Sequence, residues 1–179
     1  GNGFTISANN VHIFGFKVTG FGTGVRMSKN SSPYHTVYIG QVGKGNIFYN
    51  NAFGVGMYGE YSTAVIKGNE FFDDLANPFD NTVGIHLQSS NNIVGGINSG
   101  EGNHIHHLWR GLSYASSGNQ NILVQRDSFW CNTTPVFNFA GATSTPNIIV
   151  ANSGIISGTA SANSVVEVFY QDTLGICTV

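Results

Sequence analysis

The sequence predicts an all-β protein, a right-handed parallel β-helix of about five to six coils with three short strands in each coil. Only 16 of the 179 residues are charged, which is 9% and far below the roughly 25% of an average soluble domain. Gly and Asn, the residues best suited to sharp turns, contribute 24 and 21 positions. Short apolar strands recur every 26 to 29 residues, a period typical of solenoid coils.

The same composition excludes several other classes. The hydrophobic fraction of 41% is too high for a disordered chain, and a helical bundle with salt-bridged faces would need more charges. No apolar run approaches the length of a membrane span, and the net charge of -2 gives no basic surplus for nucleic acid. A β-sandwich is the runner-up, but few Asn-Gly or Asp-Gly hairpin signals occur.

The strands fall into three sets that follow one another in each coil. The first set comprises residues 11–13, 37–39, 64–66, 93–94, 122–124 and 148–150. The second comprises 15–19, 45–49, 68–72, 102–106 and 126–130. The third comprises 25–27, 55–57, 85–87, 112–114 and the less regular 136–139.

Alternation along each strand predicts which side chains face inward, and stacked coils then align like positions in columns. In the second set the inward column reads Val18, Phe48, Phe71, Ile105 and Phe129. Its outward column reads Thr19, Tyr49, Phe72, His106 and Trp130, and a turn column follows with Asn50, Asp73, His107 and Cys131. The outward column of the first set reads His12, Tyr38, Val65, Val94, Leu123 and Ile149.

One segment carries a family resemblance. Residues 91–96 (Asn-Asn-Ile-Val-Gly-Gly) and 100–105 (Gly-Glu-Gly-Asn-His-Ile) resemble a repeat of large bacterial surface proteins with right-handed parallel β-helix regions. Residues 36–47 contain a degenerate second copy, and residues 81–85 resemble the strand that follows such a repeat. The resemblance implies the fold but no single function, because polysaccharide lyases, glycosidases, adhesins and fibres share these coils.

The tail has a different pattern. Residues 156–160 and 163–170 resemble the opening strands of Ig-like modules in bacterial surface proteins. We therefore expect a parallel β-helix over residues 1–155, followed over 156–179 by a terminal strand, a cap or the truncated start of an Ig-like module. The two cysteines, Cys131 and Cys177, are too few to form a disulfide framework, and they leave the redox compartment open.

Four residues are candidates for catalysis under an enzymatic interpretation: Asp73, Asp74, His106 and Arg110. The two carboxylates precede a lengthened corner, so they could act as acid and base or bind Ca²⁺ through oxygen ligands. Alternatively, Asp73 and Asp74 only complete a turn, as Asn50 and Asn51 do one coil earlier. His104 and His106 point outward two residues apart, a spacing that suits a base or a metal ligand but lacks an evident carboxylate.

The outward aromatic column is the candidate ligand-binding surface. Tyr49, Phe72, His106 and Trp130 should form a stripe of rings on four adjacent coils. A stripe of this kind suits a sugar ring or a protein partner, unless another part of the protein covers it. The low charge favours neutral glycans or protein surfaces over polyanions.

Together these features predict a non-catalytic structural or adhesive module of a secreted or cell-surface bacterial protein. Its expected partners are a glycan or a protein surface, with neither nucleic acid nor a membrane span, and the open ends of the coils favour axial or lateral self-association into filaments. The alternative is a polysaccharide lyase or glycosidase of pectin-lyase-like fold that uses the Asp, His and Arg candidates. We expect no cofactor, with Ca²⁺ near Asp73 and Asp74 as the one candidate.

Overall fold

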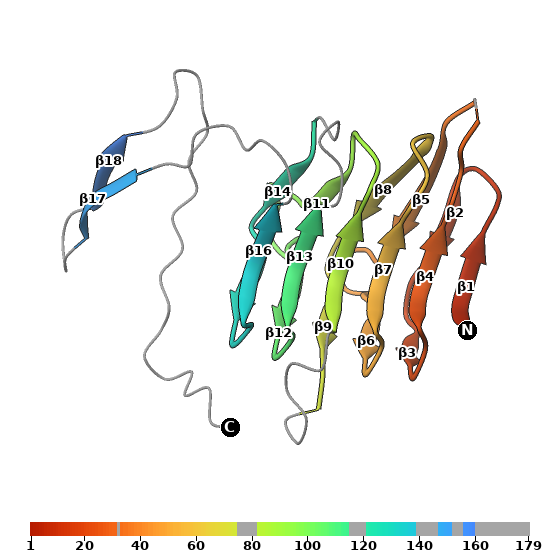
Figure 1. Ribbon diagram of the computed structural model, residues 1–179, viewed down its shortest axis with the longest axis horizontal. Coiled ribbons are helices and arrows are strands. Elements are labelled where there is room, and N and C mark those ends of the chain that lie inside the picture. The colour runs from red at the N-terminus through yellow and green to blue at the C-terminus, as the bar shows by residue number, and fades with distance from the viewer. Residues whose placement is uncertain (32, 75–81, 115–120, 139–146, 152–155, 160–179) are drawn as a thin grey trace.

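The computed structural model describes residues 1–31, 33–74, 82–114, 121–138, 147–151 and 156–159. Its strands follow one another along a solenoid, and the strands of successive coils lie side by side (Figure 1). The described residues form no helix, so none is long and apolar enough to span a membrane.

Three parallel sheets make up the solenoid, and each takes one strand from every coil. Sheet A contains β1 (Asn2–Ile6), β4 (Thr23–Met27), β7 (Phe53–Met57), β10 (Val83–Leu87), β13 (Arg110–Tyr114) and β16 (Thr134–Asn138). Sheet B contains β2 (Val11–Ile13), β5 (His35–Ile39), β8 (Ser62–Ile66), β11 (Ile93–Gly95) and β14 (Leu123–Gln125). Sheet C contains β3 (Lys17–Thr19), β6 (Ile47–Tyr49), β9 (Glu70–Phe72), β12 (His104–His106) and β15 (Ser128–Trp130).

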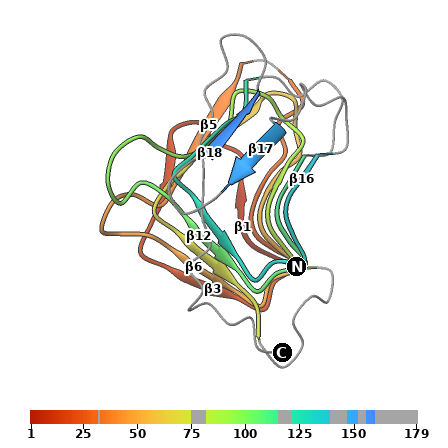
Figure 2. The same cartoon turned by 90° about the vertical axis from the view of Figure 1, so that its left-hand side faces the viewer.

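The predicted fold class, a parallel β-solenoid with three strands per coil, is confirmed. The stack amounts to about four turns, slightly fewer than the five to six that we predicted. Viewed along the axis, the coils superpose and the three sheets enclose one core (Figure 2). Strand β1 was not predicted, and it forms the first strand of sheet A.

Two details of the strand assignment were wrong. Residues 148–150 do not continue sheet B, because β17 (Asn147–Ala151) pairs antiparallel with β18 (Ile156–Thr159) instead. In sheet B, Ile93 and not Val94 aligns with Val65, and Val94 is fully buried. A slip of one residue moves a side chain to the other face of a strand, and two adjacent apolar residues give no signal to prevent it. The domain boundary at 155 and the Ig-like tail stay predictions, since residues 160–179 lie outside the described part.

Apolar columns fill the interior. In sheet C the registers align Val18, Phe48, Phe71 and Ile105, all at most 3% exposed. The rings of Phe48 and Phe71 stack 4.7 Å apart with an angle of 7° between their planes. Because the coils repeat at the spacing of a sheet, each side chain packs on its equivalents above and below.

A column of glycines allows this packing at the second position of five sheet A strands, β1, β4, β7, β10 and β13. A Cβ atom at Gly54 would lie 2.5 Å from the carbonyl oxygen of Gly84 and 2.6 Å from the ring of Phe71. Gly84 has the same environment, with the oxygen of Gly111 at 2.6 Å. The corner between sheets C and A therefore requires a glycine at this position, because a side chain there would collide with the next coil and with the core.

A ladder of buried polar side chains forms the corner between sheets B and C. The Nδ2 atom of Asn46 donates to Oδ1 of Asn69, Asn69 donates to Asn103, and Asn103 donates to Asp127, at 2.9, 3.0 and 2.7 Å. Each Asn also donates from Nδ2 to the backbone carbonyl that ends the sheet B strand one coil earlier, for example Asn69 to Ile39 at 2.9 Å. The ladder thus satisfies polar groups that would otherwise be buried without partners.

Candidate functional site

The outward side chains of sheet C form the candidate contact surface. The registers place Thr19, Tyr49, Phe72, His106 and Trp130 in one column across the five strands of sheet C. We call Tyr49, Phe72, His106 and Trp130 the aromatic stripe. All four are partly exposed. They point outward because alternate residues of a strand face opposite sides, and the residues before them in the strands point inward.

The rings of the stripe stack on one another along the axis. Phe72 and His106 are 5.2 Å apart with 5° between their planes, and His106 and Trp130 are 4.2 Å apart with 14°. Tyr49 is tilted by 36° against Phe72 at 4.9 Å. Because neighbouring rings cover each other's faces, the interior of the stripe offers edges to a partner, and a sugar ring would have no free aromatic face there to stack on.

A carboxylate and a second histidine flank the stripe. Nε2 of His106 is 3.2 Å from Oε1 of Glu70, and Nδ1 of His106 is 2.7 Å from Nδ1 of His107. His107 has a left-handed backbone conformation (φ 53°), as do Gly20, Asn50 and Cys131 at equivalent turns. This conformation brings two consecutive side chains together, whereas on a regular strand they would point to opposite faces.

These contacts define one arrangement of protons when Glu70 is ionised. The carboxylate only accepts, so Nε2 of a neutral His106 carries its proton and Nδ1 carries a lone pair. His107 must then donate from Nδ1, which leaves its Nε2 as an acceptor. Burial is the main cause that lowers the pKa of His106, with the hydrogen bond to Glu70 opposing it. Burial also lowers the pKa of His107, so burial favours the neutral form of both rings.

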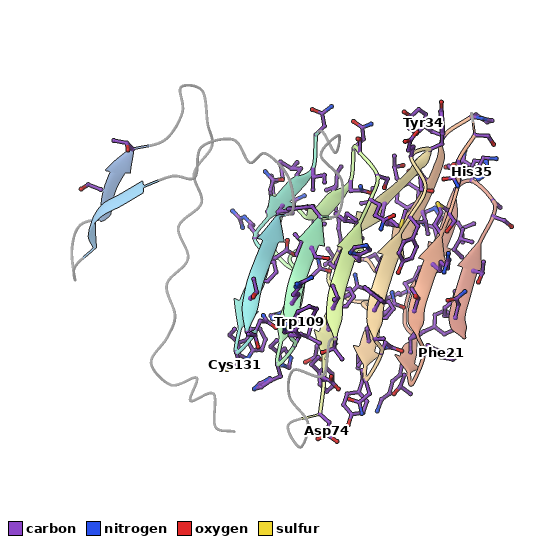
Figure 3. The ribbon with its side chains drawn as sticks, viewed as in Figure 1. Phe21, Tyr34, His35, Asp74, Trp109 and Cys131 are labelled. Atoms are coloured by element: carbon purple, nitrogen blue, oxygen red, sulfur yellow. The ribbon has the colours of Figure 1, made fainter. Side chains whose placement is uncertain are left out.

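The two predicted catalytic carboxylates are engaged in a turn. Asp73 is buried, and its Oδ1 accepts the backbone N–H of Asp74 at 2.8 Å. Asp74 receives the Tyr49 hydroxyl at 3.5 Å, and its N–H also reaches Oδ1 of Asn50 at 2.9 Å. Asp74 lies on the edge of the solenoid that also carries Phe21, Trp109 and Cys131 (Figure 3). The lengthened corner, 75–81, lies outside the described residues, so the Ca²⁺ site stays a prediction.

Arg110 lies on a different sheet from His106. It opens β13 of sheet A, and its guanidinium lies 3.6 Å from the centre of the Trp109 ring. The carboxylate that contacts His106 is Glu70, which sequence analysis did not select. A diagonal relationship could have revealed it, because Glu70 aligns with His104 and is therefore diagonal to His106.

His86 belongs to a separate network on sheet A. Its Nδ1 is 2.7 Å from the hydroxyl of Ser113, and its Nε2 is 3.0 Å from the amide of Gln88. Burial lowers the pKa of His86, with a smaller contribution from the positive charge of Arg110. Ser113 is only 1% exposed, so this serine–histidine pair has the contact distance of a nucleophile and base but no access for a substrate. Among the residues described, no three His, Cys, Asp or Glu side chains gather as metal ligands.

The motif that carries the family resemblance forms a corner of the fold. Gly95 and Gly100 have φ values of 76° and 78°, in the left-handed region. Gly96 leaves room for the Glu101 carboxylate, whose Oε2 accepts the N–H of Asn98 at 3.1 Å and whose Oε1 accepts Lys67 at 3.0 Å. Asn103 is a member of the buried ladder. These five positions of the motif therefore have structural roles in the corner.

Replacing Glu101 with glutamine should remove an acid-sensitive contribution to stability. The N–H of Asn98 and the ammonium of Lys67 lower the pKa of Glu101 from 4.5 to about 2. Because the folded pKa is the lower one, this contribution is present above about pH 4.5 and is lost as the pH falls toward about 2. Thermal melts should give E101Q a lower Tm than the wild type at pH 6 and an equal Tm near pH 2.

The exposed Glu60 is the matched control for Glu101. Its replacement by glutamine should leave the Tm difference from the wild type constant over the same pH range. A constant difference for E101Q as well would contradict the proposed role of this carboxylate.

No family model, no curated protein and no solved structure matches this chain. The class that the geometry itself defines is a three-sheeted parallel β-solenoid with an outward aromatic stripe.

Proposed function

We propose that the chain is a non-catalytic structural and adhesive module of a secreted or cell-surface bacterial protein, with the aromatic stripe as its contact surface. The observation that carries the proposal is the register of four rings on four successive coils. A rigid solenoid presents such rings without the entropy cost of ordering a loop, which favours their use in contacts.

The arrangement of titratable groups supports a role without catalysis. A hydrolase or lyase site needs an acid and a base that converge on one substrate position. Asp73 and Asp74 are held within a turn, His106 has hydrogen-bond partners on both ring nitrogens, and Arg110 belongs to sheet A.

A cysteine supports the extracellular location. Cys131, which directly follows the last ring of the stripe, is disulfide-bonded, and the described residues contain no free cysteine. Cys177, the other cysteine of the chain, lies outside the described part. Disulfides persist mainly in oxidising compartments, and this agrees with secretion.

A partner of the aromatic stripe must contact the edges of its rings and the polar side chains that lie beside them. Glu70, His104 and His107 border the stripe with acceptors and donors, and Ser128 bonds His104 at 3.2 Å. A protein surface or a glycan that approaches through its hydroxyl groups fits this mixture. Strands β1, β2 and β3 each end a sheet with one described neighbour, which supports axial self-association of the module.

A binding screen on glycan arrays and whole cells tests this proposal. The double variant Phe72→Ser with Trp130→Ser should weaken binding at least about tenfold, since buried aromatic contacts dominate such interfaces. The matched control is Tyr38→Ser with Leu123→Ser, which alters the outward column of sheet B. Equal loss in both variants, or no bound ligand for the wild type, would refute the adhesive role.

A further inference from the structure

The corner between sheets B and C carries most of the exposed apolar side chains. We call residues 14–17, 40–47, 67–69, 96–103 and 126–127 the B–C ridge. Among the described residues eight large apolar side chains are exposed, and five of them belong to the ridge: Phe14, Phe16, Val42, Ile47 and Ile97. Phe16, Val42 and Ile97 are 50%, 53% and 66% exposed, so half or more of each residue is open to solvent.

Contacts between coils make the ridge one continuous surface. Ile47 donates its N–H to the carbonyl of Phe16 at 2.8 Å, and the Lys44 ammonium lies 5.7 Å from the Phe14 ring. Val42 extends across the short corner 67–69 toward Gly100. A Cβ atom at Gly100 would lie 3.2 Å from Cγ1 of Val42. The exposed apolar side chains therefore come from three of the four corners between β2 and β12, and none comes from the short corner 67–69.

The ridge is convex. In the view along the axis, the loops that join β5 to β6 and β11 to β12 project outward from the superposed coils (Figure 2). Val42 lies in the first of these loops and Ile97 in the second. Apolar side chains that project from a convex edge do not enclose a small ligand. They are suited to insertion into a deformable apolar layer.

The ridge is also basic, although the whole chain has a net charge of -2. It contains Lys17, Lys44 and Lys67, three of the chain's four lysines, together with Arg126. Its two acidic residues are Glu101, which pairs with Lys67, and Asp127, which is 1% exposed at the end of the buried ladder. Glu70, which aligns with Ile47 in sheet C, is bonded to His106.

We propose that the B–C ridge is a peripheral binding edge for an anionic lipid surface. The apolar side chains enter the boundary between headgroups and acyl chains, and the lysines contact the negative headgroups. Apolar residues flanked by basic ones are the combination that lies in a membrane interface. A lipid surface accommodates an irregular convex edge, whereas a protein partner would need a matching acidic groove. The ridge adjoins the aromatic stripe where Lys17 lies 5.5 Å from the centre of the Tyr49 ring. The proposal rests on the apolar and basic side chains of the ridge itself and does not depend on the proposed function.

Vesicle co-sedimentation of the full chain tests the proposal. We expect binding to phosphatidylcholine vesicles that contain phosphatidylserine, little binding to phosphatidylcholine alone, and weaker binding as the NaCl concentration rises. The triple variant Phe16→Ser, Val42→Ser, Ile97→Ser should bind at least about tenfold more weakly. The variant Lys17→Gln with Lys44→Gln should bind more weakly and lose part of the salt dependence.

The control variant is Tyr34→Ser with Leu123→Ser, two exposed apolar side chains outside the ridge. It should bind vesicles as the wild type does, and melting curves of every variant should match because all the altered side chains are exposed. Absence of binding to anionic vesicles, or an equal loss in the control, overturns the proposal. Capture by a soluble polyanion that resists the three serine substitutions would indicate charge alone and would also overturn it.

Discussion

Replacing Phe71 with alanine should lower the free energy of unfolding by about 3–5 kcal/mol. Phe71 is 1% exposed, and its ring stacks on Phe48 in the inward column of sheet C. The space that alanine leaves is bounded by the backbone of neighbouring coils, which are held by their hydrogen bonds and relax little. Chemical denaturation followed by the fluorescence of Trp109 and Trp130 measures the loss.

The adjacent Phe72 is the matched control, because it is the same residue type with the opposite orientation. Its ring lies in the aromatic stripe between Tyr49 and His106 and is partly exposed. Its replacement by alanine should cost about 1 kcal/mol, the value of a partly exposed ring contact. Equal losses for the two variants would contradict the assignment of inward and outward faces.

The columns of sheet C follow directly from the sequence. The polar–apolar–polar triplets Lys17–Val18–Thr19 and His104–Ile105–His106 separate the two faces, and Gly or Asn marks the corner before each strand of sheet C except β15. The period of the coils then aligns equivalent positions without further information. The register of the stripe could therefore be predicted residue by residue.

Sheet B shows where this reasoning fails. Ile93 and Val94 are both apolar, so alternation cannot tell which of them faces inward, and the hydrogen bond from Ala64 to the buried Asn92 fixes the register. Residues 148–150 fit the pattern of a sheet B strand equally well, but pairing with β18 is a contact that a local pattern does not contain. Both the register of β11 and the pairing partner of β17 depend on contacts with distant residues, which the local sequence pattern does not contain.

The candidate site shows a similar limit. The enzymatic interpretation grouped Asp73 and Asp74 with His106, whereas the contact that forms joins His106 to Glu70 on the neighbouring strand. Arg110 is close to His106 in sequence, but the corner between them places the two residues on different sheets. In a solenoid, residues one coil apart are closer partners than residues four positions apart, so a site must be sought along columns.

Replacing Asn69 with alanine should lower the free energy of unfolding by about 3–4 kcal/mol, since several buried polar groups lose their partners at once. Oδ1 of Asn69 accepts both the N–H and the Nδ2 of Asn46, each at 2.9 Å. Its Nδ2 donates to the carbonyl of Ile39 and to Oδ1 of Asn103. Asn2, which is exposed and bonds only Thr5 among the contacts described, is the control, and N2A should cost less than about 0.5 kcal/mol.

The variant N69D distinguishes the contribution of the hydrogen-bond ladder from the contribution of side-chain packing, because aspartate matches asparagine in size. A carboxylate would keep the acceptor for Asn46 but would place its second oxygen against two other acceptors, the Ile39 carbonyl and Oδ1 of Asn103. Folding would therefore raise the pKa of that carboxyl group, because its protonated form can donate one of these bonds. N69D should be strongly destabilised at pH 8 and less so at pH 4. A loss that does not change with pH would mean that volume, and not the directed hydrogen bonds of the ladder, determines stability at this corner.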